Sequence, residues 1–155
     1  METFCDIVWK EELMNLKKIF SVAVVLLLLS STLMMKAQTK QHRVLFAITS
    51  GDEADWHMTL GNIRHLMEGF SGDSVEVEVV AYGPGVNMVK RPSSVDADIQ
   101  ALETKHVRFV ACENSMRAQK MTVADLVTGV GTVPAGIVEV VTKQEQGWTY
   151  IKAGR

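Results

Sequence analysis

The sequence is most informative at Val107-Arg108-Phe109-Val110-Ala111-Cys112-Glu113-Asn114-Ser115-Met116. Val107 to Ala111 is a short, mostly apolar run of the kind that forms a buried strand, and Cys112 ends it. Glu113-Asn114-Ser115 then opens a helical segment that we expect to reach Lys120. Strands that alternate with helices are typical of proteins with a parallel sheet. The segment therefore predicts an α/β fold with a cysteine at the end of a strand.

A first strand and helix are predicted upstream. Val44 to Ile48 is a continuous apolar run, as in a strand buried on both faces. The turn Thr49-Ser50-Gly51-Asp52 follows, and Ser50 and Glu53 have the spacing of a capping box at a helix start. Apolar residues then recur at steps of four and three, which indicates one face of an amphipathic helix: Trp56, Leu60, Ile63, Met67 and Phe70.

A second strand and helix precede the cysteine. Val75 to Ala81 reads as a strand that starts near a sheet edge, because valine alternates with glutamate there. Gly83-Pro84-Gly85 is expected to be a turn, followed by a loop through Lys90-Arg91-Pro92. Ser93-Ser94 should cap a second helix that carries apolar residues on one side: Val95, Ile99 and Leu102.

The C-terminal part is ambiguous, because β-branched residues from Ile137 to Val141 favour a strand. However, Pro134 suits the first turn of a helix and Gly147 suits its end. We predict a strand at Val130 to Val133, a helix at Ala135 to Gln146 and a strand at Trp148 to Lys152. This order of elements predicts a mostly parallel, about five-stranded sheet with helices on both faces.

Length and charge narrow the possible functions. The 155 residues fit one domain, and the net charge is −2. Lysine and arginine form no run beyond Lys17-Lys18 and Lys90-Arg91, so the basic face of a nucleic-acid-binding protein is missing. The four histidines lack metal-ligand spacing, and Gly83-Pro84-Gly85 lacks the third glycine of a dinucleotide-binding loop. We expect no nucleic-acid partner, no metal and no cofactor.

The first 37 residues have the features of a signal peptide. Lys17-Lys18 precede an apolar run from Ile19 to Leu29, and Ala37-Gln38 suits a signal-peptidase site. Met14 is a better start for such a leader than the first methionine. The run is also close to the length that spans a bilayer, so a retained membrane anchor is the alternative.

Cleavage would leave residues 38–155 as one exported domain, periplasmic or secreted and not bound to a membrane. Cys5 would leave with the leader, so Cys112 would be the single cysteine of the mature chain, without an internal disulfide. An unpaired thiol in an oxidising compartment is unusual, which makes Cys112 the first candidate for chemistry.

Cys112 also lies where open α/β sheets bind ligands, beyond the carboxyl ends of the strands. A helix start directly after it favours a thiolate, and Arg117 and Lys120 add positive potential. Glu113 works against this with a negative charge. We expect a sulfur that faces the cleft with a lowered pKa; the alternative is a buried, inert cysteine. Other strand ends at the same cleft are Thr49-Ser50-Gly51-Asp52, Gly83-Pro84-Gly85 and Gly131-Thr132.

Several of these segments together resemble the DsrE/DsrF-like family. They are Thr49-Ser50-Gly51-Asp52 after the first strand, Tyr82-Gly83-Pro84-Gly85-Val86, and Phe109 to Met116. The C-terminal blocks Val133-Pro134-Ala135-Gly136-Ile137-Val138-Glu139 and Gln146 to Lys152 are similar to its YchN-like branch. The resemblance covers roughly residues 43–154.

The resemblance implies a three-layer α/β/α domain that forms homo-oligomers, often trimers or hexamers. Some family members carry a persulfide on a cysteine after the third strand and pass sulfur between proteins, and Cys112 stands at that place. An export signal is a departure from the cytoplasmic relay proteins. Cys112 is thus the expected catalytic residue, and the expected binding residues are Asn114, Ser115, Met116, Ser50, Gly51, Gly83, Gly85 and Arg117.

Two hypotheses of function follow. In the first, the protein is a thiol-based sulfur carrier or transferase, in which Cys112 accepts sulfur from a donor protein and Asn114 and Ser115 orient the donor. In the second, it is a non-catalytic oligomeric module that binds a small anion or a partner protein in the same cleft. A buried or protonated Cys112 would favour the second hypothesis.

Overall fold

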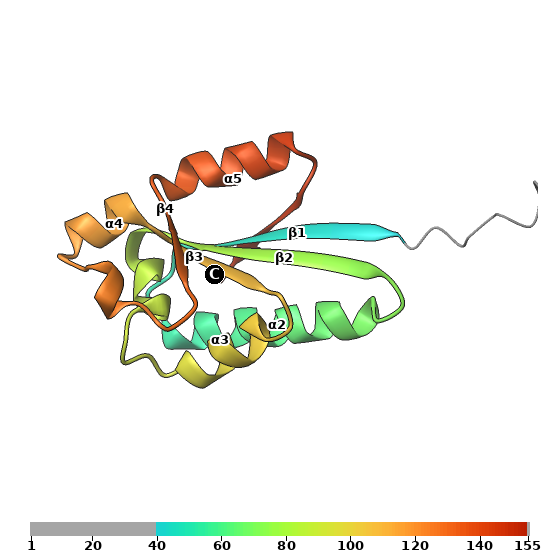
Figure 1. Cartoon of the computed structure of the whole chain (residues 1–155), viewed down its shortest axis with the longest axis horizontal. Coiled ribbons are helices and arrows are strands. Elements are labelled where there is room, and N and C mark those ends of the chain that lie inside the picture. Colours follow the sequence, from blue (N-terminus) through green and yellow to red (C-terminus); the bar gives the residue numbers. More distant parts are fainter. Residues whose placement is uncertain (1–39, 155) are drawn as a thin grey trace, which may run out of the picture. The chain divides into compact units, whose positions relative to one another are not determined.

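Five parallel strands form one sheet in the order β4-β3-β2-β1-β5 (Figure 1). The computed structural model describes residues 40–154, so the predicted signal peptide, its cleavage site and Cys5 lie outside the described residues. The sequence-based prediction of an α/β fold with a mostly parallel, about five-stranded sheet is confirmed. The strands are β1 (Gln41–Ile48), β2 (Ser74–Ala81), β3 (Arg108–Cys112), β4 (Gly131–Val133) and β5 (Thr149–Ala153).

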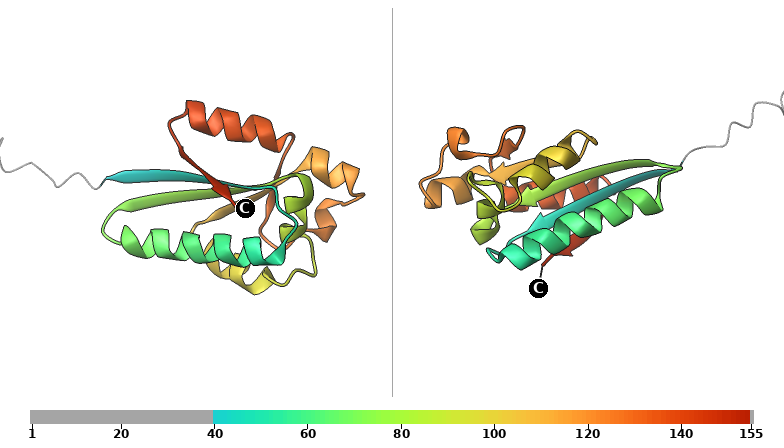
Figure 2. Two further views of the ribbon diagram at one scale, coloured as in Figure 1. Left: turned by 180° about the vertical axis from the view of Figure 1, so that it is seen from behind. Right: turned by 90° about the horizontal axis from the view of Figure 1, so that it is seen from below.

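Helices cover both faces of the sheet and complete three layers (Figures 1 and 2). α2 (Glu53–Gly69) and α3 (Asp96–Glu103) pack on one face, and α5 (Gly136–Glu145) packs on the other. The chain runs from β1 to β4 in one direction along the sheet, then crosses back to β5 beside β1. Since crossovers between parallel strands are right-handed, this reversal places α5 opposite α2 and α3.

Three short elements complete the fold: η1 (Gly83–Val89) and η2 (Val123–Asp125), both 3₁₀ helices, and α4 (Glu113–Ala118). η1 corrects the sequence-based reading, which expected a turn and a loop after β2. Val86, Met88 and Val89 are fully buried in the core, and this packing orders the segment. Within residues 40–154, no helix is long and apolar enough to cross a membrane.

The strands are apolar on both sides because both faces of the sheet are buried. Successive side chains of a strand point to opposite faces. Phe46 therefore joins the larger core under α2 and α3, while its neighbours Leu45 and Ala47 join a smaller core with Val140 and Trp148 on the α5 side. This explains why Val44 to Ile48 reads as a continuous apolar run.

Two helix starts differ from the prediction. Asp52, not Ser50, caps α2, because its Oδ1 accepts the N–H of the residue two positions on at 2.9 Å. Ser50 instead accepts the N–H of Asp52 at 3.2 Å. α3 begins at Asp96 with Val95 as its cap residue, not at the predicted serines. A charged carboxylate in or just before the first turn complements the helix dipole better than a hydroxyl does.

The ambiguous C-terminal region is helical, as predicted, but α5 does not bury its apolar side. Gly136 and Val140 are buried against the sheet. Ile137, Val138 and Val141 are 57%, 60% and 47% exposed, respectively. The helix therefore presents an apolar stripe to its surroundings, and a glycine and a lysine share its inner side with Val140.

Candidate functional site

Cys112 is the last residue of β3 and pairs in register with Val133, the last residue of β4. The helix that follows β3, α4, packs through Met116 into the core on the α2 side. The helix that follows β4, α5, lies on the opposite face (Figure 1). Ligands of open α/β sheets bind beyond the carboxyl ends of the strands. Cys112 is thus placed at the carboxyl edge of the sheet, between two helices that go to opposite faces.

Hydrogen-bond donors from two helix starts converge on the sulfur of Cys112. Burial raises the pKa of the thiol, but the Ser115 hydroxyl and the backbone N–H groups of Gly136, Ser115 and Asn114 donate to the sulfur. Together they outweigh burial and lower the pKa below its ordinary 9.0. The direction is the one that the sequence predicts. The site therefore favours a thiolate over a thiol.

Ser115 is oriented by the backbone after β2. Its Oγ accepts a hydrogen bond from the Gly83 N–H at 2.8 Å, which leaves the hydroxyl proton for the sulfur of Cys112. Gln119 Nε2 donates to the Gly83 carbonyl oxygen at 3.1 Å, so both polar groups of this glycine are engaged. Gly83 has a φ of +57°, a conformation that favours glycine. α4 and the start of η1 are thereby fixed to each other.

Gly136 allows α5 to approach the cysteine closely. A Cβ at this position would lie 2.8 Å from Cβ of Tyr82 and 3.1 Å from Cβ of Cys112. Any larger residue would push the helix start away from the sulfur. The absence of a side chain at Gly136 is therefore what brings its N–H within hydrogen-bonding reach of Cys112.

The charged residues of α4 are paired with other side chains. Glu113 Oε1 accepts a hydrogen bond from Thr132 Oγ1 at 3.0 Å. Arg117 donates to the Asn114 side chain and lies 3.8 Å from Glu113 Oε2. Glu113, which was expected to oppose the thiolate, is thus paired with Thr132 and Arg117. Arg117, which was expected to favour the thiolate, is engaged with Glu113 and Asn114 instead.

The thiol is enclosed, with Cys112 only 4% exposed. An open hollow of about 380 Å³ adjoins it and is lined by Gly83, Pro84, Asn114, Ser115, Ala118 and Gln119. Ser115 belongs to both, because it lines the hollow and bonds the sulfur. A molecule in the hollow would therefore meet Ser115 before it met Cys112.

The other predicted binding residues have different surroundings. Gly51 packs beside Pro84, at 3.4 Å from where its Cβ would be, so the Ser50-Gly51 turn borders the same end of the sheet. Gly85 is buried, and a Cβ there would lie 2.3 Å from the carbonyl oxygen of Ile48. Met116 points into the larger core, and Arg117 is exposed. Of the predicted set, the hollow includes Gly83, Asn114 and Ser115.

The sequence analysis did not single out Gly136, Gln119 or Tyr82 as site residues. Tyr82 follows β2 beside Gly136, and burial, together with nearby Tyr150, raises the pKa of its phenol. A usable signal existed for Gly136, because it follows the strand end adjacent to Cys112 and opens a helix. The role of Gln119 depends on the turn of α4 and left no mark in the sequence pattern.

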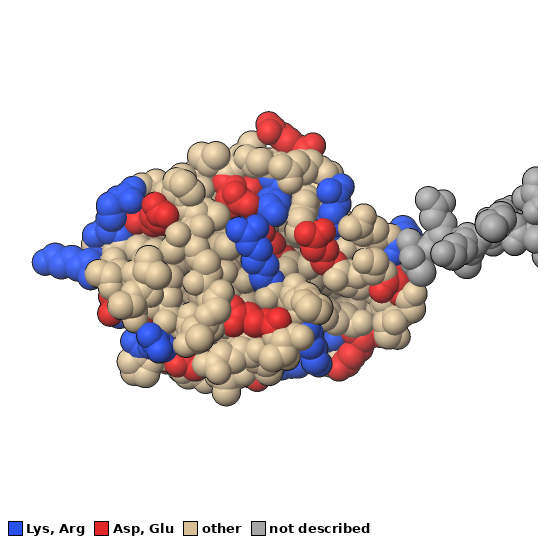
Figure 3. All heavy atoms as spheres, viewed as in Figure 1, with Lys and Arg blue, Asp and Glu red and all other residues tan. Residues whose placement is uncertain are grey.

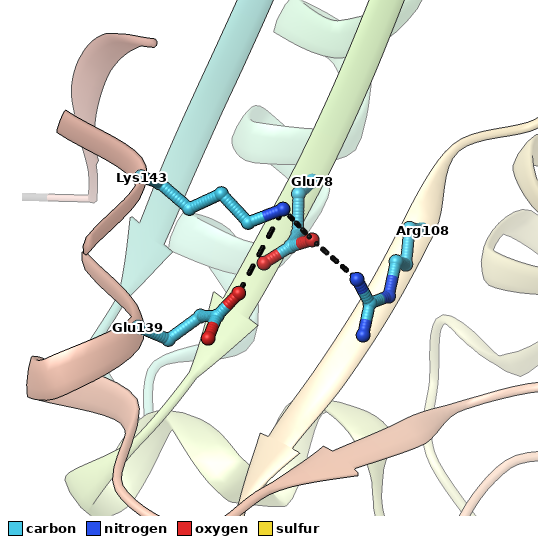
Figure 4. Close-up of polar contacts among 4 residues, drawn as sticks. All are labelled: Glu78, Arg108, Glu139 and Lys143. Atoms are coloured by element: carbon cyan, nitrogen blue, oxygen red, sulfur yellow. Dashed lines mark hydrogen bonds and ion pairs between the residues drawn. The ribbon is translucent and has the colours of Figure 1, made fainter. Parts of the chain in front are cut away.

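A buried carboxylate lies between α5 and the sheet (Figure 4). Glu78 of β2 is 1% exposed, and its Oε2 lies 2.9 Å from Lys143 Nζ and 3.1 Å from Arg108 Nη1. Glu139, one turn before Lys143 on α5, lies 3.7 Å from the same Nζ. Burial raises the pKa of Glu78, and Lys143 and Arg108 act in the opposite direction.

The sequence did not reveal this cluster. The alternation of valine and glutamate suggested a strand that starts near an edge, whereas β2 lies between β1 and β3. Glu78 is tolerated in the interior because two cations meet it there.

Among residues 40–154, no three His, Cys, Asp or Glu side chains are grouped so that they could hold a metal ion. On the face shown in Figure 3, lysine and arginine are interspersed with aspartate and glutamate. The site is thus a thiol with hydrogen-bond donors around it, next to a small open hollow.

Comparisons with known proteins identify the family and agree with the fold. The model of the DsrE/DsrF-like family matches residues 42–153. A solved structure of a protein of unknown function from Methanobacterium thermoautotrophicum is 40% identical, with a TM-score of 0.69. The match covers 72% of this chain and 98% of that one. No curated protein matches the chain.

Proposed function

Because this chain belongs to the DsrE/DsrF-like family, we propose that it is a thiol-based sulfur carrier in which Cys112 accepts sulfur as a persulfide. Family membership suggests a role related to sulfur relay. The observation that carries the finer proposal is the convergence of the Ser115 hydroxyl and backbone N–H groups on one sulfur, at the carboxyl edge of the sheet. A structural cysteine in an apolar core has no need of such donors.

The proposed transfer is an exchange between sulfur atoms. The Cys112 thiolate attacks the outer sulfur of a persulfide, R–S–SH, on a donor protein. A bond forms between Sγ and that sulfur, the S–S bond of the donor breaks, and the electron pair leaves on the donor as its thiolate, RS⁻. Cys112 becomes Cys–S–SH, and no external oxidant or reductant is required. The donors around Sγ stabilise the attacking thiolate.

The burial of Cys112 favours a second candidate, a non-catalytic module that binds a small anion or a partner protein in the hollow beside Ser115. The two candidates differ in whether the sulfur reacts while the protein is folded. In the sulfur carrier, the residues that enclose Cys112 move to admit the donor. In the binding module, these residues stay in place.

Sulfur loading separates these candidates. The purified full chain is incubated with polysulfide and digested, and the peptide that contains Cys112 is weighed by mass spectrometry. We expect this peptide to gain the mass of one sulfur atom, to lose it again on reduction, and to stay unchanged in the Cys112→Ser variant. Loading of Cys112 that occurs only after unfolding would contradict the sulfur carrier and leave the binding module.

The apolar stripe of α5 supports a further part of the proposal, that the protein forms homo-oligomers, as trimers or hexamers. Ile137, Val138 and Val141 on α5 and Tyr150 on β5 are large apolar residues with 40% to 60% of their surface exposed. Contiguous exposed apolar residues mark interaction surfaces. Light scattering of the purified protein should give a multiple of the monomer mass.

We also propose that the protein works after export, on the strength of Lys17-Lys18 and the apolar run that follows. A sulfur donor or acceptor protein would then be an exported partner too. N-terminal sequencing of the protein from the cell envelope should find a start near Gln38. An intact leader on membrane-bound protein would contradict cleavage.

A further inference from the structure

The hydrogen bonding of the Cys112 sulfur depends on where α5 lies on the sheet. Gly136 donates its N–H to the sulfur from the first turn of this helix, and Tyr82 and Cys112 leave no room for a closer approach. A small displacement of α5 away from the sheet would therefore lengthen this hydrogen bond. Because hydrogen bonds weaken steeply with distance and angle, the thiolate would lose one of its donors.

α5 is held to the sheet along a single line of residues. Gly136, Val140 and Lys143 share its inner side at steps of four and three, and only the first two are apolar contacts. The outer side is exposed. At the far end of the helix, Arg43 Nη2 donates to the carbonyl oxygen of Gln146 at 2.7 Å. Lys143 is thus the charged residue of α5 that anchors the helix to the sheet, and it lies between Gly136 and the C-cap.

The partner of Lys143 is the buried Glu78. Their atoms lie 2.9 Å apart, with the lysine side chain 12% exposed and the glutamate 1% exposed (Figure 4). Lys143 Nζ also lies 4.3 Å from the centre of the Trp148 ring, which limits its freedom further. An ion pair that is so deeply buried has a defined geometry, because neither charged group can regain its hydration while the helix stays in place.

We propose that Glu78 is a positioning residue for Cys112: its ion pair with Lys143 fixes α5 at the height at which Gly136 reaches the sulfur. The link runs through the backbone of one helix, and its two contacts, Gly136 and Lys143, are seven residue steps, or about 10 Å, apart. The inference rests on the proposed role of Cys112 as the reactive group. The sign of the expected effect distinguishes it from direct electrostatics.

Glu78 pairs with Arg108 in register, and Cys112 lies four residues farther along β3, about 13 Å away. Acting through space, loss of the negative charge in Glu78→Gln would favour the thiolate. Loss of the helix anchor would disfavour it. Lys143→Gln removes the other half of the same anchor but a charge of opposite sign. Positioning therefore shifts the pKa of Cys112 in the same direction in both variants, whereas direct electrostatics shifts this pKa in opposite directions.

The test measures ionisation without requiring access to the buried thiol. Thiolate absorbance in the ultraviolet is recorded against pH for each full-length variant. The trace of the same variant with Cys112→Ser is then subtracted, and this subtraction also removes the absorbance of Cys5. We expect the midpoint to move to higher pH in both Glu78→Gln and Lys143→Gln. Loss of one hydrogen bond to a charged sulfur would lower the thiolate fraction at neutral pH by up to about tenfold.

Arg108→Gln is the matched control. It removes the other cation of Glu78 at the same height on the sheet but leaves α5 anchored, so its midpoint should stay near that of the unmodified protein. An unchanged or lowered midpoint in folded Glu78→Gln, or an equal rise in Arg108→Gln, would overturn the proposal. If Glu78→Gln does not fold, Lys143→Gln decides against the same control. Sulfur loading of the unmodified protein tests the proposed function separately.

Discussion

The hydroxyl of Ser115 accepts the N–H of Gly83 at 2.8 Å and donates its own proton to the sulfur of Cys112. A backbone group at the end of β2 thereby sets the direction of a hydrogen bond at the end of β3. The Ser115 side chain cannot change its rotamer without leaving the Gly83 N–H unsatisfied, and this N–H is partly buried. The thiolate is thus stabilised by the fold and not by mobile charges.

Ser115→Ala should raise the pKa of Cys112, because the side-chain donor to the sulfur is lost and burial continues to oppose the thiolate. The thiolate fraction at neutral pH should fall by up to about tenfold. Thiolate absorbance against pH gives the midpoint, with the Cys112→Ser form of each variant subtracted. Ser93→Ala, which alters a hydroxyl at the start of α3, should leave the midpoint unchanged.

Gly136→Ala should destabilise the protein by about 1–3 kcal/mol, because the new methyl group would lie 2.8 Å from Cβ of Tyr82 and overpack the site. It should also raise the pKa of Cys112, since α5 must move away from the sulfur. Gly61→Ala is the matched control: nothing lies within 4 Å of a Cβ there, and alanine should stabilise α2 by about 0.5–1 kcal/mol. Urea unfolding of both variants measures the difference, and equal stabilities would contradict the close approach.

Stability should rise with pH in the range just below the ordinary pKa of a thiol. The folded protein releases the Cys112 proton at a lower pH than the unfolded chain, whose thiol keeps its ordinary value of 9.0. Between these two pKa values the unfolded state binds the extra proton, so the free energy of unfolding increases as pH rises. The contribution is complete above the unfolded value. Urea midpoints compared between the unmodified protein and Cys112→Ser should show the rise only in the former; parallel profiles would argue against a lowered pKa.

Val141→Glu should dissociate the proposed homo-oligomer, because it puts a charge into the exposed apolar stripe of α5. The fold should tolerate the change, since the side chain is 47% exposed. Val123→Glu provides the comparison: Val123 is 66% exposed on η2, outside that stripe. Light scattering should give a smaller mass for Val141→Glu only. The same mass for both variants would exclude the α5 stripe as the interface.

Several members of the site were accessible from the sequence because they lie at strand ends. Residues that follow parallel strands meet at one edge of the sheet whatever the details of packing. The apolar run before Cys112 and the glycines after β2 were therefore enough to bring Cys112, Ser115 and Gly83 together in advance. The role of Gly83 was still incomplete, since its left-handed backbone and its bond to Ser115 depend on η1, which the sequence pattern did not reveal.

Periodicity in the sequence determined the α/β class, the parallel sheet and the placement of the Cys112 thiol at its carboxyl edge, because these depend on local pattern and on the handedness of crossovers. Only the tertiary structure decided that α5 turns Gly136 and Lys143 inward and leaves its apolar residues outside. It also decided that Glu78 is buried in a central strand and that four donors meet at the sulfur of Cys112. These features depend on how far each helix lies from the sheet and how it is rotated. Packing against residues distant in the chain sets both, and local sequence does not record them.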